Sequence, residues 1–192
     1  MMDHIRIRAR PGLTLIELTV VLVVVGLVAS IGMPRIDLTR IRMDSGFRQI
    51  GMTMLKAQRT AVVRQHGVVV AFDTAGRRLR IHEDRNNDGN IQTGEPVEFV
   101  ALEEGVLYGR GTANPLPMGS GTVTFVKRQT GWPAVTFHRS GSAGETGGFY
   151  LTSSRATSAV RWASDGRAYT VNRSTGRVFQ YQYAGGTWRR RF

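Results

Sequence analysis

Hydrophobic residues follow one another almost without interruption from Leu13 to Met33, where Glu17 is the only charged residue. At a rise of about 1.5 Å per residue, a helix of this length is about 30 Å long and matches the hydrocarbon core of a bilayer. A carboxylate inside such a span costs roughly 2.5–3.5 kcal/mol, so Glu17 is expected to have a cationic partner and a function. The pattern predicts a transmembrane helix over residues 13–34.

From residue 35 to residue 67 the hydrophobic positions recur in steps of three and four, the spacing of a helix with one apolar face. Pro34 lacks a backbone donor and crowds the preceding turn, so we expect a kink or local melting there before the helix resumes. Gly67 supplies the expected end, and Met52 is assigned to core packing rather than to a ligand site. The stripe expected to pack on a sheet contains Ile36, Met43, Phe47, Ile50, Met54, Ala57 and Ala61.

After Gly67, hydrophobic and polar residues alternate with a period of two, which is typical of strands. Residues 109–121 have the least regular pattern and are expected to form a surface loop. The sequence therefore predicts an α+β fold, in which the long N-terminal helix packs on antiparallel β-sheets of a domain spanning residues 68–192. The predicted strands are Val68–Phe72, Leu79–His82, Val97–Ala101, Val106–Tyr108, Thr122–Val126, Ala134–Phe137, Gly148–Thr152, Ala159–Ala163, Ala168–Val171 and Arg177–Tyr183.

Composition limits both the size of the domain and its chemistry. The chain has 192 residues, no cysteine and a formal charge of +12, and all but two of its 26 basic residues are arginine. Enough chain remains beyond the apolar segment for one small domain, in which disulfides and thiolate chemistry are excluded. The four histidines lack metal-ligand spacing, and neither a nucleophile elbow nor a glycine-rich phosphate loop is present. We predict a non-enzymatic protein with no cofactor, catalytic residue or metal site.

The twelve residues before the apolar segment carry Arg6, Arg8 and Arg10 against a single aspartate. Such a basic flank stays in the cytoplasm, so the domain after the helix is expected outside it. A secretory signal peptide is the alternative, but residues 30–34 make only a weak cleavage site and Glu17 argues against it. Removal of this leader would lower the formal charge from +12 to +10.

A cut between Gly12 and Leu13 would supply the cation that Glu17 requires, because the freed amine of Leu13 lies one helical turn from the carboxylate. The run from Gly12 through Leu13-Thr14-Leu15-Ile16-Glu17-Leu18 into an apolar helix resembles the class III leader motif of type IV pilins and type II secretion pseudopilins. The resemblance implies that a prepilin peptidase cleaves after Gly12 and methylates Leu13, where the family more often has phenylalanine. It also implies that Glu17 and Pro34 serve in filament assembly.

Four downstream segments are similar to the GspH/FimT family of minor pseudopilins. The resemblance implies a type IV pilin-like fold and a structural role in the periplasmic pseudopilus of a type II secretion system, supporting protein secretion from a single-pass anchor in the inner membrane. The implied partners are other pseudopilins or minor pilins, the prepilin peptidase and the inner-membrane assembly platform. The segments are Ala57–Ala61, Val135–Phe137, Gly147–Leu151 and Ser174–Val178.

Residues 84–95 match the pattern of an EF-hand loop, with carboxylates and amides at ligand positions and Gly89 at the sharp turn. An EF-hand needs flanking helices, whereas strand-like segments flank this loop. Asp, Asn and Gly also form ordinary turns, because they tolerate left-handed backbone conformations and hydrogen-bond to their own chain. An ordinary turn is therefore favoured over calcium binding.

Arginine and aromatic residues gather near the C-terminus. Guanidinium groups pair with phosphates and rings stack on bases, so a DNA-binding minor pilin for DNA uptake is the alternative function. A solvated basic tail, or one attracted to anionic membrane surfaces, is the simpler interpretation, and an unrelated single-pass protein is the third. The candidate DNA-binding residues are Arg177, Trp188, Arg189, Arg190 and Arg191.

Overall fold

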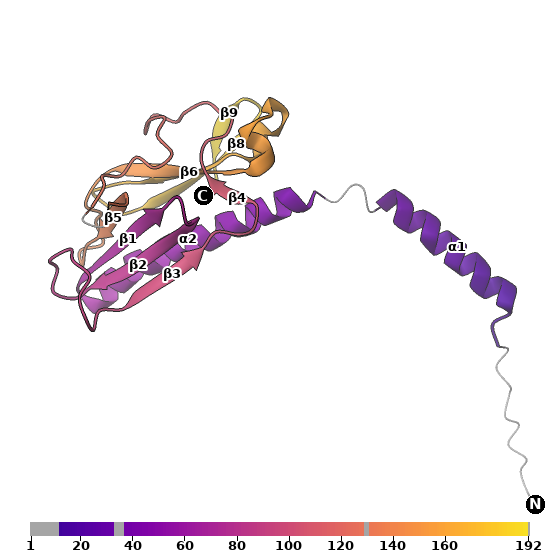
Figure 1. Ribbon diagram of the computed structural model, residues 1–192, viewed down its shortest axis with the longest axis horizontal. Helices are drawn as coiled ribbons and strands as arrows, with labels where there is room; N and C mark the ends of the chain where they lie inside the picture. The colour runs from indigo at the N-terminus through magenta and orange to yellow at the C-terminus, as the bar shows by residue number, and fades with distance from the viewer. Residues whose placement is uncertain (1–11, 33–36, 129–130, 192) are drawn as a thin grey trace, which may run out of the picture. The chain divides into compact units, whose positions relative to one another are not determined.

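The computed structural model describes residues 12–32, 37–128 and 131–191 (Figure 1). The chain divides into two compact units, Met1–Asp37 and Leu38–Phe192, and each is described by itself. The predicted leader up to residue 11, and Pro34 with its predicted kink, lie outside the described residues.

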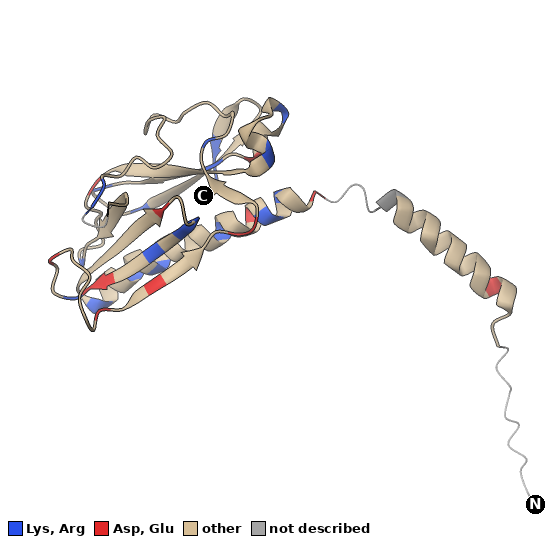
Figure 2. Cartoon of the chain, in the orientation of Figure 1, with Lys and Arg blue, Asp and Glu red and all other residues tan. Residues whose placement is uncertain are grey.

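The first unit contains α1 (Leu15–Gly32), a helix of 18 residues. Glu17 is its only charged residue, so Figure 2 colours α1 with a single red position and no blue one. Leucine and valine side chains are exposed on every side of the helix. Within the described residues, no helix combines the length and the hydropathy that crossing a membrane requires.

The second unit begins with α2 (Leu38–Arg64), whose buried stripe is the one predicted from Met43 to Ala61. Met52 is an exception to the predicted core packing, because a step of two residues from Met54 places it on the opposite face, where it is 67% exposed. The expected stop at Gly67 is also wrong. Gln65 adopts the left-handed backbone conformation and ends the helix, and its side-chain amide donates to the Val62 carbonyl at 2.6 Å.

Two antiparallel sheets complete the second unit, with strand orders β3-β2-β1-β5 and β4-β6-β7-β8-β9. The predicted α+β fold, with a long helix packed on antiparallel sheets, is therefore confirmed. The first sheet contains β1 (Gly67–Asp73), β2 (Arg78–Asp84), β3 (Val97–Ala101) and β5 (Ala134–Phe137). The second contains β4 (Val106–Tyr108), β6 (Gly147–Ser153), β7 (Arg167–Val171), β8 (Val178–Ala184) and β9 (Thr187–Arg190).

Both β1 and β6 are buried along their whole length, because each is covered on both faces. On one face, the rings of Phe72 of β1 and Phe149 of β6 pack in a tilted arrangement with centroids 4.7 Å apart and join the α2 stripe in one core. On the other face of β1, Trp132 packs against Val69 and Ala71. These strands read as continuous apolar runs in the sequence for this reason.

The outer face of β6 is covered by the predicted surface loop, residues 109–121. The Tyr150 hydroxyl donates to the Gly119 carbonyl at 2.8 Å and accepts from the Leu116 amide at 2.7 Å. Ala113 in the same loop is fully buried. The loop lacks regular strands, as predicted, but it is a packed cover rather than a free surface segment.

Two predicted strands are wrong and one strand was missed. In place of the strand predicted at residues 159–163, residues 160–163 belong to η3 (Val160–Asp165), a 3-10 helix. Its Asp165 carboxylate accepts from Ser153 Oγ at 2.5 Å and from Arg155 Nε at 2.7 Å. Residues 122–126 form only an isolated bridge between Val123 and Phe149. The C-terminal tail, expected to be solvated, forms β9 at the edge of the second sheet.

An ion pair between a buried arginine and a partly exposed aspartate joins the start of α2 to the second sheet. Arg167 of β7 is 1% exposed, and its Nη2 atom lies 2.7 Å from Asp44 Oδ1. Its Nη1 atom donates to the carbonyl groups of Ser164 and Gly166, so most of the donors of this guanidinium are satisfied. Because a buried charge is costly without a partner, this pair fixes the position of α2 on the second sheet.

The Asp44→Asn substitution removes the counter-charge of a buried guanidinium while keeping the side-chain shape. We expect the free energy of unfolding to fall by about 2–3 kcal/mol, measured by chemical denaturation. Glu104→Gln is the control, because the Arg42–Glu104 pair is 48% and 81% exposed and is worth less than about 1 kcal/mol. Equal losses in the two variants would show that the buried pair contributes no more than a surface pair.

Candidate functional site

The N-terminal motif is built around a reciprocal pair of hydrogen bonds between Thr14 and Glu17. The Thr14 backbone amide and its hydroxyl both donate to Glu17 Oε2 at 2.9 Å, and the Glu17 amide donates to Thr14 Oγ1 at 3.3 Å. This arrangement is a capping box, which satisfies two backbone donors at the start of a helix. Gly12 and Leu13 precede it without helical structure and are exposed, so the predicted cleavage site is accessible.

Sequence reasoning missed this second role of Glu17. The signal was present as Thr14-x-x-Glu17 immediately before an apolar run. Glu17 Oε1 makes no hydrogen bond to any of the described residues, whereas Oε2 accepts twice from Thr14. The carboxylate therefore caps its own helix with Oε2, which leaves Oε1 able to accept a hydrogen bond from another group.

The loop that matches the EF-hand pattern is held at its end by the Glu95 carboxylate. The His82 Nε2 atom lies 2.7 Å from Glu95 Oε2, and these side chains are 2% and 6% exposed. The backbone amides of Arg85 and Gln92 also donate to the Glu95 carboxylate, at 2.8 and 3.0 Å. The hydrogen bond from His82, followed by those from the two amides, lowers the pKa of Glu95 from 4.5 to about 2.

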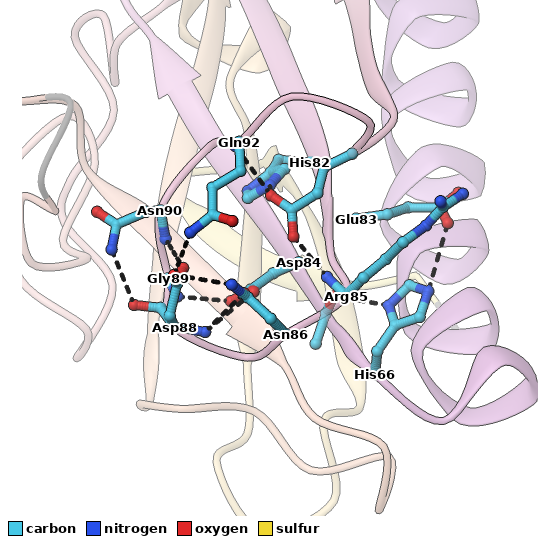
Figure 3. Close-up of polar contacts among 12 residues, drawn as sticks. His66, His82, Glu83, Asp84, Arg85, Asn86, Asp88, Gly89, Asn90 and Gln92 are labelled. Atoms are coloured by element: carbon cyan, nitrogen blue, oxygen red, sulfur yellow. Dashed lines mark hydrogen bonds and ion pairs between the residues drawn. The ribbon is translucent and has the colours of Figure 1, made fainter.

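The other carboxylates of the loop also accept hydrogen bonds from the loop itself (Figure 3). Asp84 accepts from the backbone amides of Asp88 and Gly89 at 3.1 and 2.7 Å. The Asp88 carboxylate accepts from the backbone amide of Asn90 at 2.7 Å and from the side-chain amide of Gln92 at 2.5 Å. The described residues contain no cluster of three or more His, Cys, Asp or Glu side chains able to hold a metal ion. These hydrogen bonds close the loop on itself. The residues that match the EF-hand pattern therefore form a turn, which is the interpretation favoured from the sequence.

Trp188 makes several contacts within the second unit. Its indole Nε1–H donates to the Asn114 carbonyl at 2.6 Å, and its ring packs against Tyr150 and Tyr183 with centroids 5.7 and 5.2 Å away. The side chain joins β9 to the loop that covers β6. Trp188 therefore has a structural role, and its predicted role in DNA binding stays a prediction.

The predicted arginines fall into two overlapping groups. Arg189, Arg190 and Arg191 line one groove of about 640 Å³ together with Arg40 from the first turn of α2. Arg177 lies outside this groove and meets Arg190 over the Phe179 ring, with guanidinium carbons 5.3 and 4.1 Å from the ring centroid. The sequence could not indicate Arg40, because it is distant from the tail along the chain.

The Glu95→Gln substitution tests whether this carboxylate fastens the loop. Because folding lowers its pKa, Glu95 stabilises the protein fully above about pH 4.5, and this contribution is lost as the pH falls to about 2. We expect the variant to melt below the wild type at pH 6, with a difference that shrinks on acidification. Glu98→Gln, which removes an exposed pair with Lys56, is the control. A difference that stays constant between pH 6 and 2 would contradict the assignment.

Comparison with known proteins gives a limited result. No family model matches the chain, and no curated protein sequence matches it. Two solved structures of the minor pseudopilin EpsH from the type 2 secretion system of Vibrio cholerae are similar to it. The first is 14% identical over 78% of this chain and 95% of that chain, and the second is 15% identical over 79% and 94%, each with a TM-score of 0.37.

Proposed function

We propose that the chain is a minor pseudopilin, a non-enzymatic structural subunit of the periplasmic pseudopilus in a type II secretion system or a related type IV pilus-like machine. The observation that carries the proposal is the N-terminal arrangement, in which Gly12 and Leu13 precede a Thr14-capped helix whose only charge is Glu17. The second unit supports it, because a helix packed on antiparallel sheets is the architecture that the sequence resemblance implies.

Glu17 is suited to pair with an N-terminal amine. Cleavage after Gly12 creates such an amine at Leu13, both on its own chain and on every neighbouring subunit. Attraction between the amine and the carboxylate is strong among apolar helices, because the surroundings screen charge poorly. The oxygen of Glu17 that Thr14 leaves unused is the natural acceptor.

The apolar surface of α1 requires cover, because leucine and valine are exposed around the whole helix. In this proposal residues 13–34 lie in the inner membrane before assembly, with the N-terminus cytoplasmic and the second unit periplasmic. Helices of other pseudopilins replace the lipid in the filament, and Pro34 allows the chain to bend there. The prepilin peptidase and the assembly platform act on this same segment.

A DNA-binding minor pilin for DNA uptake is the second candidate. The groove lined by Arg40, Arg189, Arg190 and Arg191 favours it, because basic residues bind the phosphate backbone of DNA. Trp188 weighs against it, because its ring and its N–H are already engaged.

Processing of the N-terminus is the first test of the proposal. When the full chain is expressed with a prepilin peptidase, mass spectrometry should find a product that begins at a methylated Leu13. Gly12→Val should block the cut, because the branched side chain fills the position that the peptidase reads as glycine. A product that begins at any other residue contradicts both pilin proposals.

Two substitutions separate the charge of Glu17 from its capping role. Glu17→Gln keeps a side-chain oxygen for the Thr14 amide but has no charge, whereas Thr14→Val removes the capping hydroxyl and leaves the charge. We expect both variants to be inserted and cleaved, and only Glu17→Gln to fail in filament incorporation, measured by immunoblotting of sheared filaments. Normal incorporation of Glu17→Gln would show that amine pairing is not required.

A further inference from the structure

The arginine groove lies at the end of the second unit where the chain enters it. It is lined by Arg40, Arg189, Arg190 and Arg191, with Gln182 and Ala184 of β8. Arg40 belongs to the first turn of α2, eight residues after the last residue of α1. The pairing of β9 with β8 holds Arg189 and Arg190 in place, and the Arg191 backbone amide donates to the Gln180 carbonyl at 2.8 Å.

The residues that line the groove include four arginines and no acidic residue. Within the described residues, neither Arg189 nor Arg191 forms an ion pair or a side-chain hydrogen bond, and both are exposed. Guanidinium groups carry only donors and match the oxygens of phosphate. Converging like charges repel one another, so an anion that enters the groove relieves this repulsion as well as accepting hydrogen bonds.

Two observations distinguish the class of anion. Two aromatic rings near the groove already make contacts, Trp188 with Asn114, Tyr150 and Tyr183, and Phe179 with the guanidinium of Arg190. Single-stranded nucleic acid binds largely by stacking on free rings, so these two contacts reduce the ring surface open to bases. The groove also includes the first turn after the apolar segment, and basic residues next to a membrane segment are attracted to anionic lipids.

We infer that this groove binds the phosphate groups of anionic phospholipids at the surface of the membrane that holds the apolar segment. The inference rests on the proposed function, in which residues 13–34 are inserted before assembly. The contact holds the second unit against the bilayer before the subunit is incorporated into the filament. It must be broken when the subunit is extracted, so the lipid contact opposes premature assembly.

The experiment uses the full chain in vesicles of phosphatidylcholine alone and in vesicles that also contain phosphatidylglycerol. The chain has no cysteine, so Thr187→Cys gives a single site for a fluorescent donor beside the groove. Energy transfer to a headgroup-labelled lipid then reports the fraction of domains held at the surface. Flotation of the vesicles first establishes that the chain is membrane-bound.

We expect flotation with both kinds of vesicle and higher energy transfer only with phosphatidylglycerol, falling as salt is added. Replacing Arg189 and Arg191 together by glutamine should lower the ratio of bound to released domains roughly 25-fold, about fivefold for each arginine. An unchanged melting temperature will verify that the variant is folded. The salt titration of the unsubstituted chain provides a second measurement that needs no arginine variant.

The matched control replaces Arg139 and Arg173 by glutamine, which removes the same charge from the opposite end of the second unit. Each lies within two residues of a carbonyl, Gly141 or Thr175, that accepts from Gln58 of α2. Gln58 is about 27 Å along the helix from Arg40. This control variant should keep the energy transfer of the wild type.

The outcomes separate the two proposals. Failure to float contradicts the membrane segment of the proposed function. Flotation without a phosphatidylglycerol-dependent signal, or equal losses in the groove and control variants, overturns the lipid inference and leaves the proposed function standing. If duplex DNA at physiological salt removes the signal, and Arg189 and Arg191 are needed for that competition, nucleic acid is the occupant and the lipid inference is wrong.

Discussion

The second unit depends on one helix that buries a single face against two sheets. Six residues of α2 between Met43 and Ala61 supply the side of the core that neither sheet could provide. Phe72 from the first sheet and Phe149 from the second meet over that stripe, and the Asp44–Arg167 pair fixes the start of the helix beneath them. A change in the seating of α2 would therefore disturb both sheets, and with them the edge strand that positions the C-terminal arginines.

The N-terminal segment follows a different principle, because its stability cannot come from a buried core. The side chains of α1 are apolar and exposed, and in the proposed function a lipid bilayer or other helices cover them. Glu17 is the one side chain that resists such burial, and Thr14 meets only one of its two oxygens. In our account this second oxygen fixes the position of a neighbouring subunit. Burying the oxygen at low cost requires a cation at the same level along the helix axis.

Features encoded by local periodicity could be predicted from the sequence, and features made by distant contacts could not. The α2 stripe follows a spacing of 3.6 residues, so its residues from Met43 to Ala61 were identified correctly, and every strand from β1 to β8 was also predicted. Nothing near Trp188 indicates that its ring packs on Tyr150, and nothing near residues 159–163 indicates that Asp165 holds that segment as a 3-10 helix. Likewise, the groove unites Arg40 with the tail only through the pairing of β9.

The central claim is that the Glu17 carboxylate pairs with the amine of a neighbouring subunit. Filaments assembled from a mixture of chains, some with ¹⁵N-labelled leucine and others with ¹³C-labelled glutamate, allow only contacts between chains to be detected by solid-state NMR. The account predicts a signal that joins the N-terminal amine nitrogen of Leu13 to the side-chain carboxyl carbon of Glu17, at a separation of about 4 Å or less. Filaments that lack this signal, with Glu17 contacting only its own Thr14, would contradict it.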